Sequence, residues 1–445
     1  MINIIRHMNY ILKFLLPAFL FFTAFFSAKA QISQKITLQQ AVDLSIKNSS
    51  NLKILNAKIA DAVADVRGAK DHMLPDAKIT GSYLRLGGAD VNFKNLQNNN
   101  GSGGRPNVNR ALYGIANVSM PLYVGGRIKY GIESAKYLEQ AARLIAENDK
   151  EAIAYNAILA YTNIYKAQGS VLLIKQNLDA SVKRDTTFSR LEQNGLLARN
   201  DLMKARLQTS NIELSLLDAE NNLTIANINM AIMMGLAENT LIEIDSSFIN
   251  AKQELMPFAE MEKLALQNRK DIQANSMQMK AAATGIKSAK AEAYPSIALT
   301  GGYAAVNIPK LITITNALNI GIGLQYNIAS LWKTNTKLQR ARSSEIQVSA
   351  NEQVLNDQIR LQLNKDYQNY LLAQKKIEVN EKAILQATEN YRITKNKYDN
   401  SLVSVNDLLD ADVLLLQTKL NSSVSKADAA LAFNKLLQTT GTLSK

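Results

Sequence analysis

Residues 75–86 read PDAKITGSYLRL, and residues 295–306 read PSIALTGGYAAV. The two stretches share a proline, a Thr-Gly pair and a tyrosine, each at the same place within its stretch. Proline disfavours the helical conformation of the residue before it, so each stretch indicates a change from helix to strand. Similarity at a fixed spacing indicates an internal repeat.

The repeat extends over both halves of the chain. The spacing from Pro75 to Pro295, called here the first offset, also aligns Asn48 with Asn268. A slightly shorter spacing, called the second offset, aligns Gly235 with Gly441. The spacing changes across the Gly- and Asn-rich segment 98–104, because surface loops tolerate insertions. We therefore predict a first structural repeat over 31–236, an inter-repeat linker over 237–256 and a second repeat over 257–445.

Long helices are predicted where proline and glycine are scarce. No proline occurs from 122 to 256 or from 310 to the end, and neither Gly nor Pro occurs from 324 to 440. Apolar residues recur at helical spacing from Leu409 through Val413 and Leu416. The helix predicted over 127–193 would be roughly 100 Å long. The other predicted helices cover 37–74, 199–236, 258–294, 333–398 and 404–440.

Four strands are predicted beside the prolines. From Ile320 to Ile328 the even positions are apolar or aromatic and the odd positions are small or polar, which is typical of a strand with one apolar face. Residues 112–122 alternate in the same way. The predicted membrane strands are approximately 77–86, 112–124, 297–306 and 317–329.

Composition argues against several classes of function. The chain of 445 residues has no Cys and two His, which argues against disulfides, zinc sites and thiol catalysis. The net charge is +13, but Lys and Arg are spread along the predicted helices without a basic block. We therefore expect that the protein is not an enzyme and that it binds no cofactor, no metal and no nucleic acid.

The first residues have the form of a signal peptide. Arg6 and Lys13 precede and flank a short apolar run that ends near Phe26, and Ala28-Lys29-Ala30 has the small-x-small form of a cleavage site. We expect residues 1–30 to be removed. No later apolar run is long enough for a membrane helix, so a membrane crossing would have to use strands.

Four strands cannot close a barrel alone, because small closed barrels need about eight. An open sheet would leave unpaired edges in lipid. The subunit is therefore expected to share strands with copies of itself in a ring around a pore.

Three segments are similar to those of a known family. They are ITLQQAV at 36–42, PLYVGGR at 121–127 and YDNSLVSVNDLLD at 398–410. With the repeat, their order resembles the TolC-like outer-membrane efflux proteins over essentially the whole mature chain. The resemblance implies a mainly α protein with a membrane β-barrel portion. Three tandem-repeat protomers would form a twelve-stranded barrel continued by a periplasmic α-helical barrel.

The resemblance also implies a function. Such a homotrimer is the outer-membrane exit duct of a tripartite efflux or secretion system in a Gram-negative bacterium. Its tunnel extends into the periplasm and docks through an adaptor protein onto an inner-membrane pump. The alternative is an exported periplasmic helical adaptor or coiled-coil protein without a barrel. That alternative leaves four symmetrically placed strands unexplained.

Candidate functional residues cluster at the predicted far tip. Similar proteins meet the adaptor at turns that correspond to Asn194, Gly195, Leu196 and Leu197, and to Asn400, Ser401, Leu402 and Val403. Asp407 and Asp410 match acidic positions that ring the tunnel entrance, although acids also favour a helix N-terminus for its dipole. Tyr398 matches a tyrosine of the closing lock. Val403 replaces the arginine of that lock, so the closing network should differ or be weaker.

Two other motifs have simpler interpretations. Gly125-Gly126-Arg127 lacks the spacing and Lys of a phosphate loop, so we expect a strand-to-helix bend. Met230, Met233 and Met234 are expected to pack near a helix end.

Overall fold

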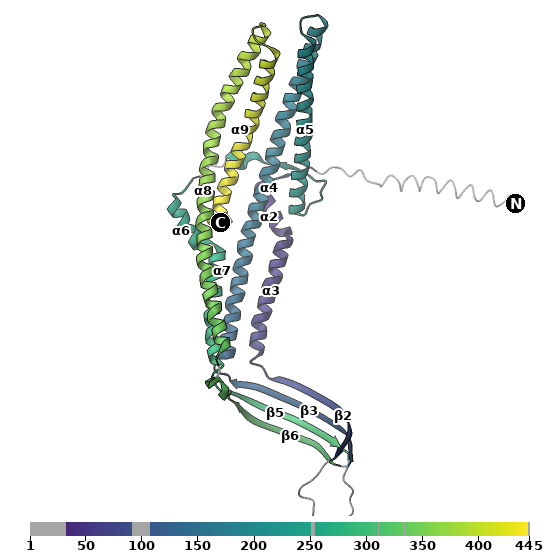
Figure 1. The fold of residues 1–445 in the computed structure, drawn as a ribbon, viewed down its shortest axis with the longest axis vertical. Coiled ribbons are helices and arrows are strands. Elements are labelled where there is room, and N and C mark those ends of the chain that lie inside the picture. The colour runs from purple at the N-terminus through teal and green to yellow at the C-terminus, as the bar shows by residue number, and fades with distance from the viewer. Residues whose placement is uncertain (1–32, 91–106, 251–253, 310, 333, 444–445) are drawn as a thin grey trace, which may run out of the picture.

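The computed structural model describes residues 33–90, 107–250, 254–309, 311–332 and 334–443. The predicted signal peptide at 1–30 and the segment 98–104 lie outside these residues. The molecule is elongated, with a sheet at one end and two helical hairpins at the other (Figure 1). Its elements, in order, are β1 (Ser33–Ile36), α2 (Leu38–Asn48), α3 (Ser50–Asp71), β2 (Asp76–Asp90), β3 (Asn107–Tyr123), α4 (Arg127–Gln193), α5 (Arg199–Met234), β4 (Leu241–Ile244), η1 (Ser246–Asn250), α6 (Phe258–Asn268), α7 (Lys270–Ala291), β5 (Ser296–Ile308), β6 (Ile312–Gln325), η2 (Ile328–Leu331), α8 (Thr336–Asp399) and α9 (Val405–Thr439).

The four long strands form one antiparallel sheet in the order β2-β3-β5-β6. The two halves of this sheet have the same register. In β2 and β3, Gly81 lies opposite Gly114, and their repeat equivalents Gly301 and Ile320 lie opposite each other in β5 and β6. The first and second offsets therefore relate paired positions in the structure as well as in the sequence.

Two helices that we predicted as continuous are each broken in two. The predicted helix 37–74 is interrupted at Ser49, whose side chain accepts a hydrogen bond from the Leu52 backbone and so caps α3. The predicted helix 258–294 is interrupted at Arg269. Neither break carries Gly or Pro, which is why residue pattern alone missed both.

The breaks receive the ends of other helices. The Asn48 side chain donates to the Met234 carbonyl oxygen, at the end of α5. At the equivalent place in the second repeat, a Cβ on Gly441 would lie 3.1 Å from the Arg269 backbone nitrogen. Both glycines have positive φ, +70° for Gly235 and +67° for Gly441, a conformation that glycine adopts without a steric penalty.

Sequence reasoning also missed a parallel pair of strands at mid-length. β1 and β4 pair over four residues each, and Tyr161 of α4 joins them. Its hydroxyl donates to the Ile36 carbonyl oxygen at 2.7 Å and accepts from the Asp245 backbone nitrogen at 2.7 Å. Met230 and Met234 are fully buried in the same core, as expected from their position near the end of a helix.

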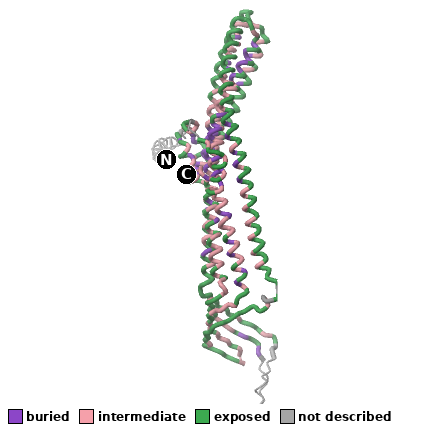
Figure 2. Tube along the Cα trace, turned by 90° about the vertical axis from the view of Figure 1, so that its left-hand side faces the viewer, coloured by how far each residue is buried: buried purple, intermediate pink, exposed green. Residues whose placement is uncertain are grey.

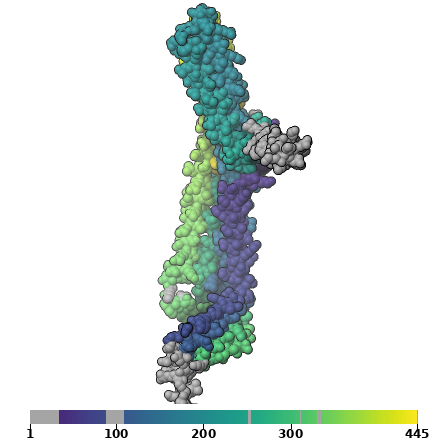
Figure 3. All heavy atoms as spheres, turned by 90° about the vertical axis from the view of Figure 1, so that its right-hand side faces the viewer, coloured from purple at the N-terminus to yellow at the C-terminus, as the bar shows by residue number. Residues whose placement is uncertain are grey.

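The helices form a curved wall rather than a globular bundle. Near the sheet, α4 packs between α3 and α7, and α7 packs against α8; towards the tip, α4 packs between α5 and α9, and α9 packs against α8. Buried residues gather about mid-length (Figure 2). In Figure 3, α5 and α3 follow one another along one edge of the wall. The opposite edge is α8, since its helical neighbours are α6, α7 and α9.

Among the described helices, none combines the length and the apolar composition that a transmembrane helix requires.

Candidate functional site at the sheet and the helical tip

One face of the sheet is apolar and exposed. A cross-strand row on this face consists of Ile79, Ala116, Tyr303 and Leu318. The next row, on the other face, consists of Lys78, Asn117, Gly302 and Asn319. Ile79 is 86% exposed and Ile320 is 82% exposed. A contiguous apolar surface of this kind marks contact with lipid or with another protein.

The predicted strand-to-helix bend at 125–127 is present. Gly125 has φ +64° and Gly126 has φ +87°, and α4 begins at Arg127. A Cβ on Gly125 would lie 2.6 Å from the Ala291 carbonyl oxygen and 2.8 Å from the Tyr294 Cβ. The glycine therefore lets β3 and α4 turn directly against the junction of α7 with β5.

The two tip turns have the same local structure. Gly195 has φ +74° and Ser401, its repeat equivalent, has φ +59°. In each turn the next backbone N–H bonds back into the preceding helix, from Leu196 to the Leu191 carbonyl and from Leu402 to the Lys397 carbonyl. This is the Schellman arrangement that satisfies helix carbonyls.

Both turns present a leucine to solvent. Leu196 and Leu402 are each 74% exposed. Leu197 instead packs against an apolar cluster, defined here as the tip cluster. The buried members of the tip cluster are Phe188, Leu202, Ala205, Val405, Leu408 and Leu409.

Asp407 and Asp410 both lie on the exposed side of α9. Asp407 forms a capping box with Ser404, accepting from the Ser404 backbone nitrogen at 2.9 Å and from its hydroxyl at 2.7 Å. These hydrogen bonds, with the side-chain bond the larger cause, hold the pKa of Asp407 below its usual value. Asp407 therefore stabilises the start of α9 while remaining accessible.

Tyr398 packs against the tip cluster, whereas Asp407 and Asp410 lie on the exposed side of α9. Its ring packs against Phe188 with ring centroids 5.6 Å apart, on the margin of the tip cluster. Burial raises the pKa of Tyr398, and the nearby carboxylates of Asp201 and Asp399 raise it further. In the single chain, Tyr398 therefore holds one hairpin against the other.

An ion pair near the tip was missed by sequence reasoning. Arg184 of α4 and Asp412 of α9 are 2.8 Å apart, and their side chains are 10% and 8% exposed. The Asn177 side-chain amide also donates to Asp412, at 3.2 Å. The only signal in the sequence was an acidic residue three positions after Leu409, within the predicted apolar stripe. Val413 of that stripe is 46% exposed, because the buried face of α9 runs through Leu408, Asp412 and Leu415 instead.

A cavity of about 850 Å³ opens beside this ion pair. It lies between the two hairpins at the tip, and its lining includes Arg184, Asp201, Tyr391, Tyr398 and Ser404. Polar and aromatic groups from both hairpins therefore meet around one space.

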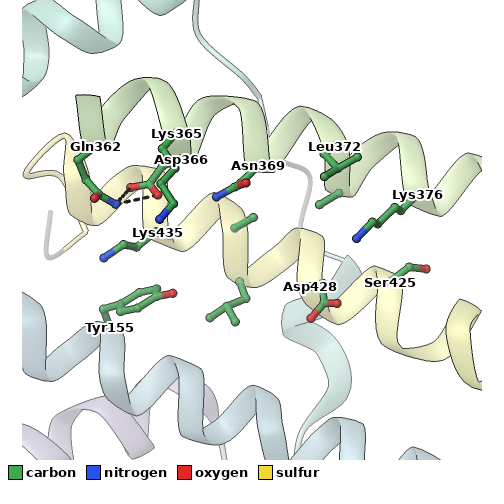
Figure 4. A pocket seen from close by; sticks show the side chains of 13 residues that line it. Tyr155, Gln362, Lys365, Asp366, Asn369, Leu372, Lys376, Ser425, Asp428 and Lys435 are labelled. Atoms are coloured by element: carbon green, nitrogen blue, oxygen red, sulfur yellow. Dashed lines mark hydrogen bonds between the residues drawn. The ribbon is translucent and has the colours of Figure 1, made fainter. Parts of the chain in front are cut away.

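A second cavity, of about 430 Å³, lies between α4, α8 and α9 nearer mid-length (Figure 4). The Lys435 ammonium lies 4.6 Å from the centroid of the Tyr155 ring. Burial lowers the pKa of Lys435; the nearby Arg269 and Lys365 lower it too, and Asp366 opposes them. Asp366 accepts hydrogen bonds from Gln362 and Thr439, which fixes its position. The described part of the chain contains no group of three or more His, Cys, Asp and Glu that could hold a metal ion.

Comparisons with known proteins agree with this architecture. Residues 262–442 match the family described as outer membrane efflux protein. The chain is 21% identical over 424 residues to the outer membrane efflux protein BepC of Brucella suis biovar 1 (strain 1330), covering 92% of this chain and 86% of BepC. It is 26% identical over 200 residues to the outer membrane protein TolC of Salmonella enteritidis, covering 42% of this chain and 40% of TolC.

A solved structure has the same fold. The CmeC outer membrane channel of Campylobacter jejuni superposes with a TM-score of 0.76 at 17% identity, over 92% of this chain and 87% of CmeC. The chain therefore shares with this channel the fold of a four-stranded antiparallel sheet that continues into two long helical hairpins. The chain is thus similar to outer membrane efflux proteins, over residues 262–442 by the family match and over most of its length by its likeness to BepC.

Proposed function

We propose that three copies of this chain form the outer-membrane exit duct of a tripartite efflux or secretion system in a Gram-negative bacterium. The three sheets would close one twelve-stranded barrel, and the helical walls would close one periplasmic tunnel. Substrates would pass from an inner-membrane pump and its adaptor, through the tunnel, to the exterior. Residues 1–30 would direct export and then be removed.

The observation that carries this proposal is the placement of exposed apolar side chains on the two edges of the wall. The α3 and α5 edge, seen in Figure 3, and the α8 edge, which lies opposite, both carry them. On α5 they are Leu207, Leu214, Leu217, Ile225 and Ile232; on α8 they are Ile346, Val354, Leu361, Val379 and Leu385.

The two edges consist of different helices, and both expose apolar side chains. Such a pair of unlike surfaces favours a head-to-tail ring of subunits. A heterologous contact between unlike surfaces repeats around a rotation axis and closes if the rotation allows it. The same contact would join β6 of one copy to β2 of the next, which removes both open edges of the sheet. Lipid does not tolerate open edges, and the exposed apolar face of the sheet is suited to lipid.

The tip would carry the two remaining roles. Asn194, Gly195, Leu196 and Leu197, with Asn400, Ser401, Leu402 and Val403, would contact the adaptor. Leu196 and Leu402 support this role because they expose apolar surface at equivalent turns. Tyr398, Asp407 and Asp410 would form the periplasmic gate. Three copies would bring six exposed carboxylates around one axis, where they would attract cations.

The rival interpretation, a periplasmic adaptor without a barrel, accounts less well for the sheet. An adaptor in water would expose Ile79 and Ile320 with no lipid to cover them. The family match also favours a channel.

The test is the native mass of the mature protein extracted from outer membranes in detergent. We expect a three-subunit particle that inserts into planar bilayers and conducts ions. A monomer that is soluble without detergent would exclude the channel and leave the adaptor as the better account.

A further inference from the structure

The internal repeat provides a template for how neighbouring copies join. Within one chain, the first repeat meets the second in the sheet, where β3 pairs with β5, and in the helical wall, where α4 packs against α7 and, towards the tip, against α9. Adding the second offset to the residue numbers of β3 and α4 gives their equivalents in the second repeat, β6 and α8. Subtracting the first offset from the residue numbers of β5 and α7 gives their equivalents in the first repeat, β2 and α3. These four equivalent elements all lie on the two free edges.

The register of the sheet shows that the two offsets relate equivalent paired residues. The pair Ser82 and Tyr113 in the first repeat becomes Gly302 and Asn319, and these two residues are paired in the second. The two offsets therefore preserve strand pairing residue by residue. A ring that repeats the in-chain contact would place Leu324 opposite Gly81 of the next copy, because Val118 lies opposite Gly301 within the chain.

In the helical part of the same contact, the residues at the equivalent positions of the edge helices carry opposite charges. Within the chain, the Ser134 hydroxyl of α4 donates to the Ala281 carbonyl oxygen of α7 at 3.1 Å. The equivalent positions are Arg340 in α8 and Asp61 in α3. Both side chains are exposed, and neither forms an ion pair or side-chain hydrogen bond within the described chain.

Neighbouring positions agree with this pairing. On α8, Val354 and Leu361 follow Arg340 at whole heptad spacings, so the three share one helix face, and they are 53% and 72% exposed. On α3, Ile54 precedes Asp61 by one heptad and is 55% exposed. Each charge therefore lies on an uncovered apolar face of an edge helix.

At the junction between sheet and helices, the equivalent positions on the two free edges also carry side chains that could pack together. Within the chain, Gly125 leaves room for Tyr294, and the next residue, Gly126, lies against Tyr130 of its own helix. The equivalents of Gly126 and Tyr294 are Trp332, which is 70% exposed, and Leu74, which is 59% exposed. Within the chain the larger residue precedes β5, whereas at the equivalent positions the larger residue, Trp332, follows β6. The two exposed apolar side chains would cover each other.

We propose that adjacent copies join in this register, with Arg340 of one copy paired to Asp61 of the next and Trp332 packed on Leu74. The proposal rests on the ring of the proposed function and specifies which residues face each other in it. A second copy of this chain is the occupant of both edges.

Cysteine cross-linking tests the register without background, because the chain contains no Cys. The test variant is full-length Asp61→Cys with Arg340→Cys, oxidised in outer membranes and separated without reductant. We expect covalent dimers and trimers. Asp61→Cys with Arg342→Cys is the matched control, since residue 342 lies about 200° around α8 from residue 340 and should leave the chains separate.

Two further measurements keep the outcomes distinct. Ser134→Cys with Ala281→Cys places the same geometry inside one chain and shows whether oxidation can bridge it. The native mass in detergent is measured on every variant. A trimer by mass that stays uncross-linked through 61 and 340, while the in-chain pair oxidises, would overturn the register and leave the trimer standing. A monomer by mass would overturn both.

Charge reversal gives an independent readout. Arg340→Glu or Asp61→Arg alone should shorten the lifetime of the detergent-extracted trimer, roughly fivefold for an exposed ion pair. The double reversal should restore it. Equal losses in the single and double variants would contradict a direct pair.

Discussion

At the scale of single residues, the two hairpins depend on a charge pair that is almost removed from water. Arg184 and Asp412 lie 2.8 Å apart beside the tip cluster. The Arg184 guanidinium also donates to Ser181, but its Nε has no hydrogen-bond partner. The pair is therefore incompletely satisfied, so loss of one member should cost more than loss of both.

We predict that Asp412→Ala destabilises the contact between α4 and α9 by about 3 kcal/mol, because the Arg184 charge would stay buried without a counter-charge. The measurement is hydrogen exchange of the two helices near the tip. Arg184→Met combined with Asp412→Leu should cost clearly less, since it leaves no charge behind. If the double variant exchanges faster than the single one, the desolvation argument is wrong.

At the scale of elements, the chain turns from sheet to helix through a glycine at a close backbone approach. Gly125 combines a positive φ with the Ala291 carbonyl oxygen 2.6 Å from where its Cβ would lie. The atom in the way belongs to the backbone, so it cannot move aside as a flexible side chain would. This corner sets the direction of α4 relative to β3.

We predict that Gly125→Ala lowers stability by about 2 to 4 kcal/mol, from left-handed strain and overpacking together. Gly131→Ala is the control, because it lies in the first turns of α4 with nothing within 4 Å of its Cβ. That control should raise stability by roughly 0.5 to 1 kcal/mol. Thermal unfolding of both variants in detergent measures the difference, and equal midpoints would refute the prediction.

At the scale of the whole molecule, the sheet and the tip lie at opposite ends of the wall (Figure 1). The proposed membrane contact and the proposed adaptor contact are therefore separated by the length of the helices. Changes at the tip turns should leave the ring and its barrel unaffected. The two roles can then be tested independently.

We predict that Leu196→Asn with Leu402→Asn abolishes adaptor binding and export while the native mass and single-channel conductance stay unchanged. Both side chains are 74% exposed, so their replacement removes apolar contact surface without opening a core. Binding of a purified adaptor by the detergent-extracted protein is the direct measurement. Unchanged binding would place the adaptor contact elsewhere.

Much of the secondary structure could be predicted from residue pattern. The helix predicted over 127–193 coincides with α4, and the helix predicted to begin at 37 starts there with a capping box formed by Thr37 and Gln40. The breaks at Ser49 and Arg269 could not be predicted, because each exists to receive the end of a distant helix. The roles of Tyr398, Asp407 and Asp410 stay predictions, since they depend on neighbouring copies.

The sequence by itself determined the repeat, the long helices and the four alternating strands. These follow from local chemistry: proline and glycine placement, and the period of apolar residues along the chain. Only the tertiary structure decided that Asp412 meets Arg184, that Tyr161 joins β1 to β4, and which edges of α3 and α8 stay uncovered. Those features depend on which distant segments come together, and periodicity along one segment carries no information about its neighbours.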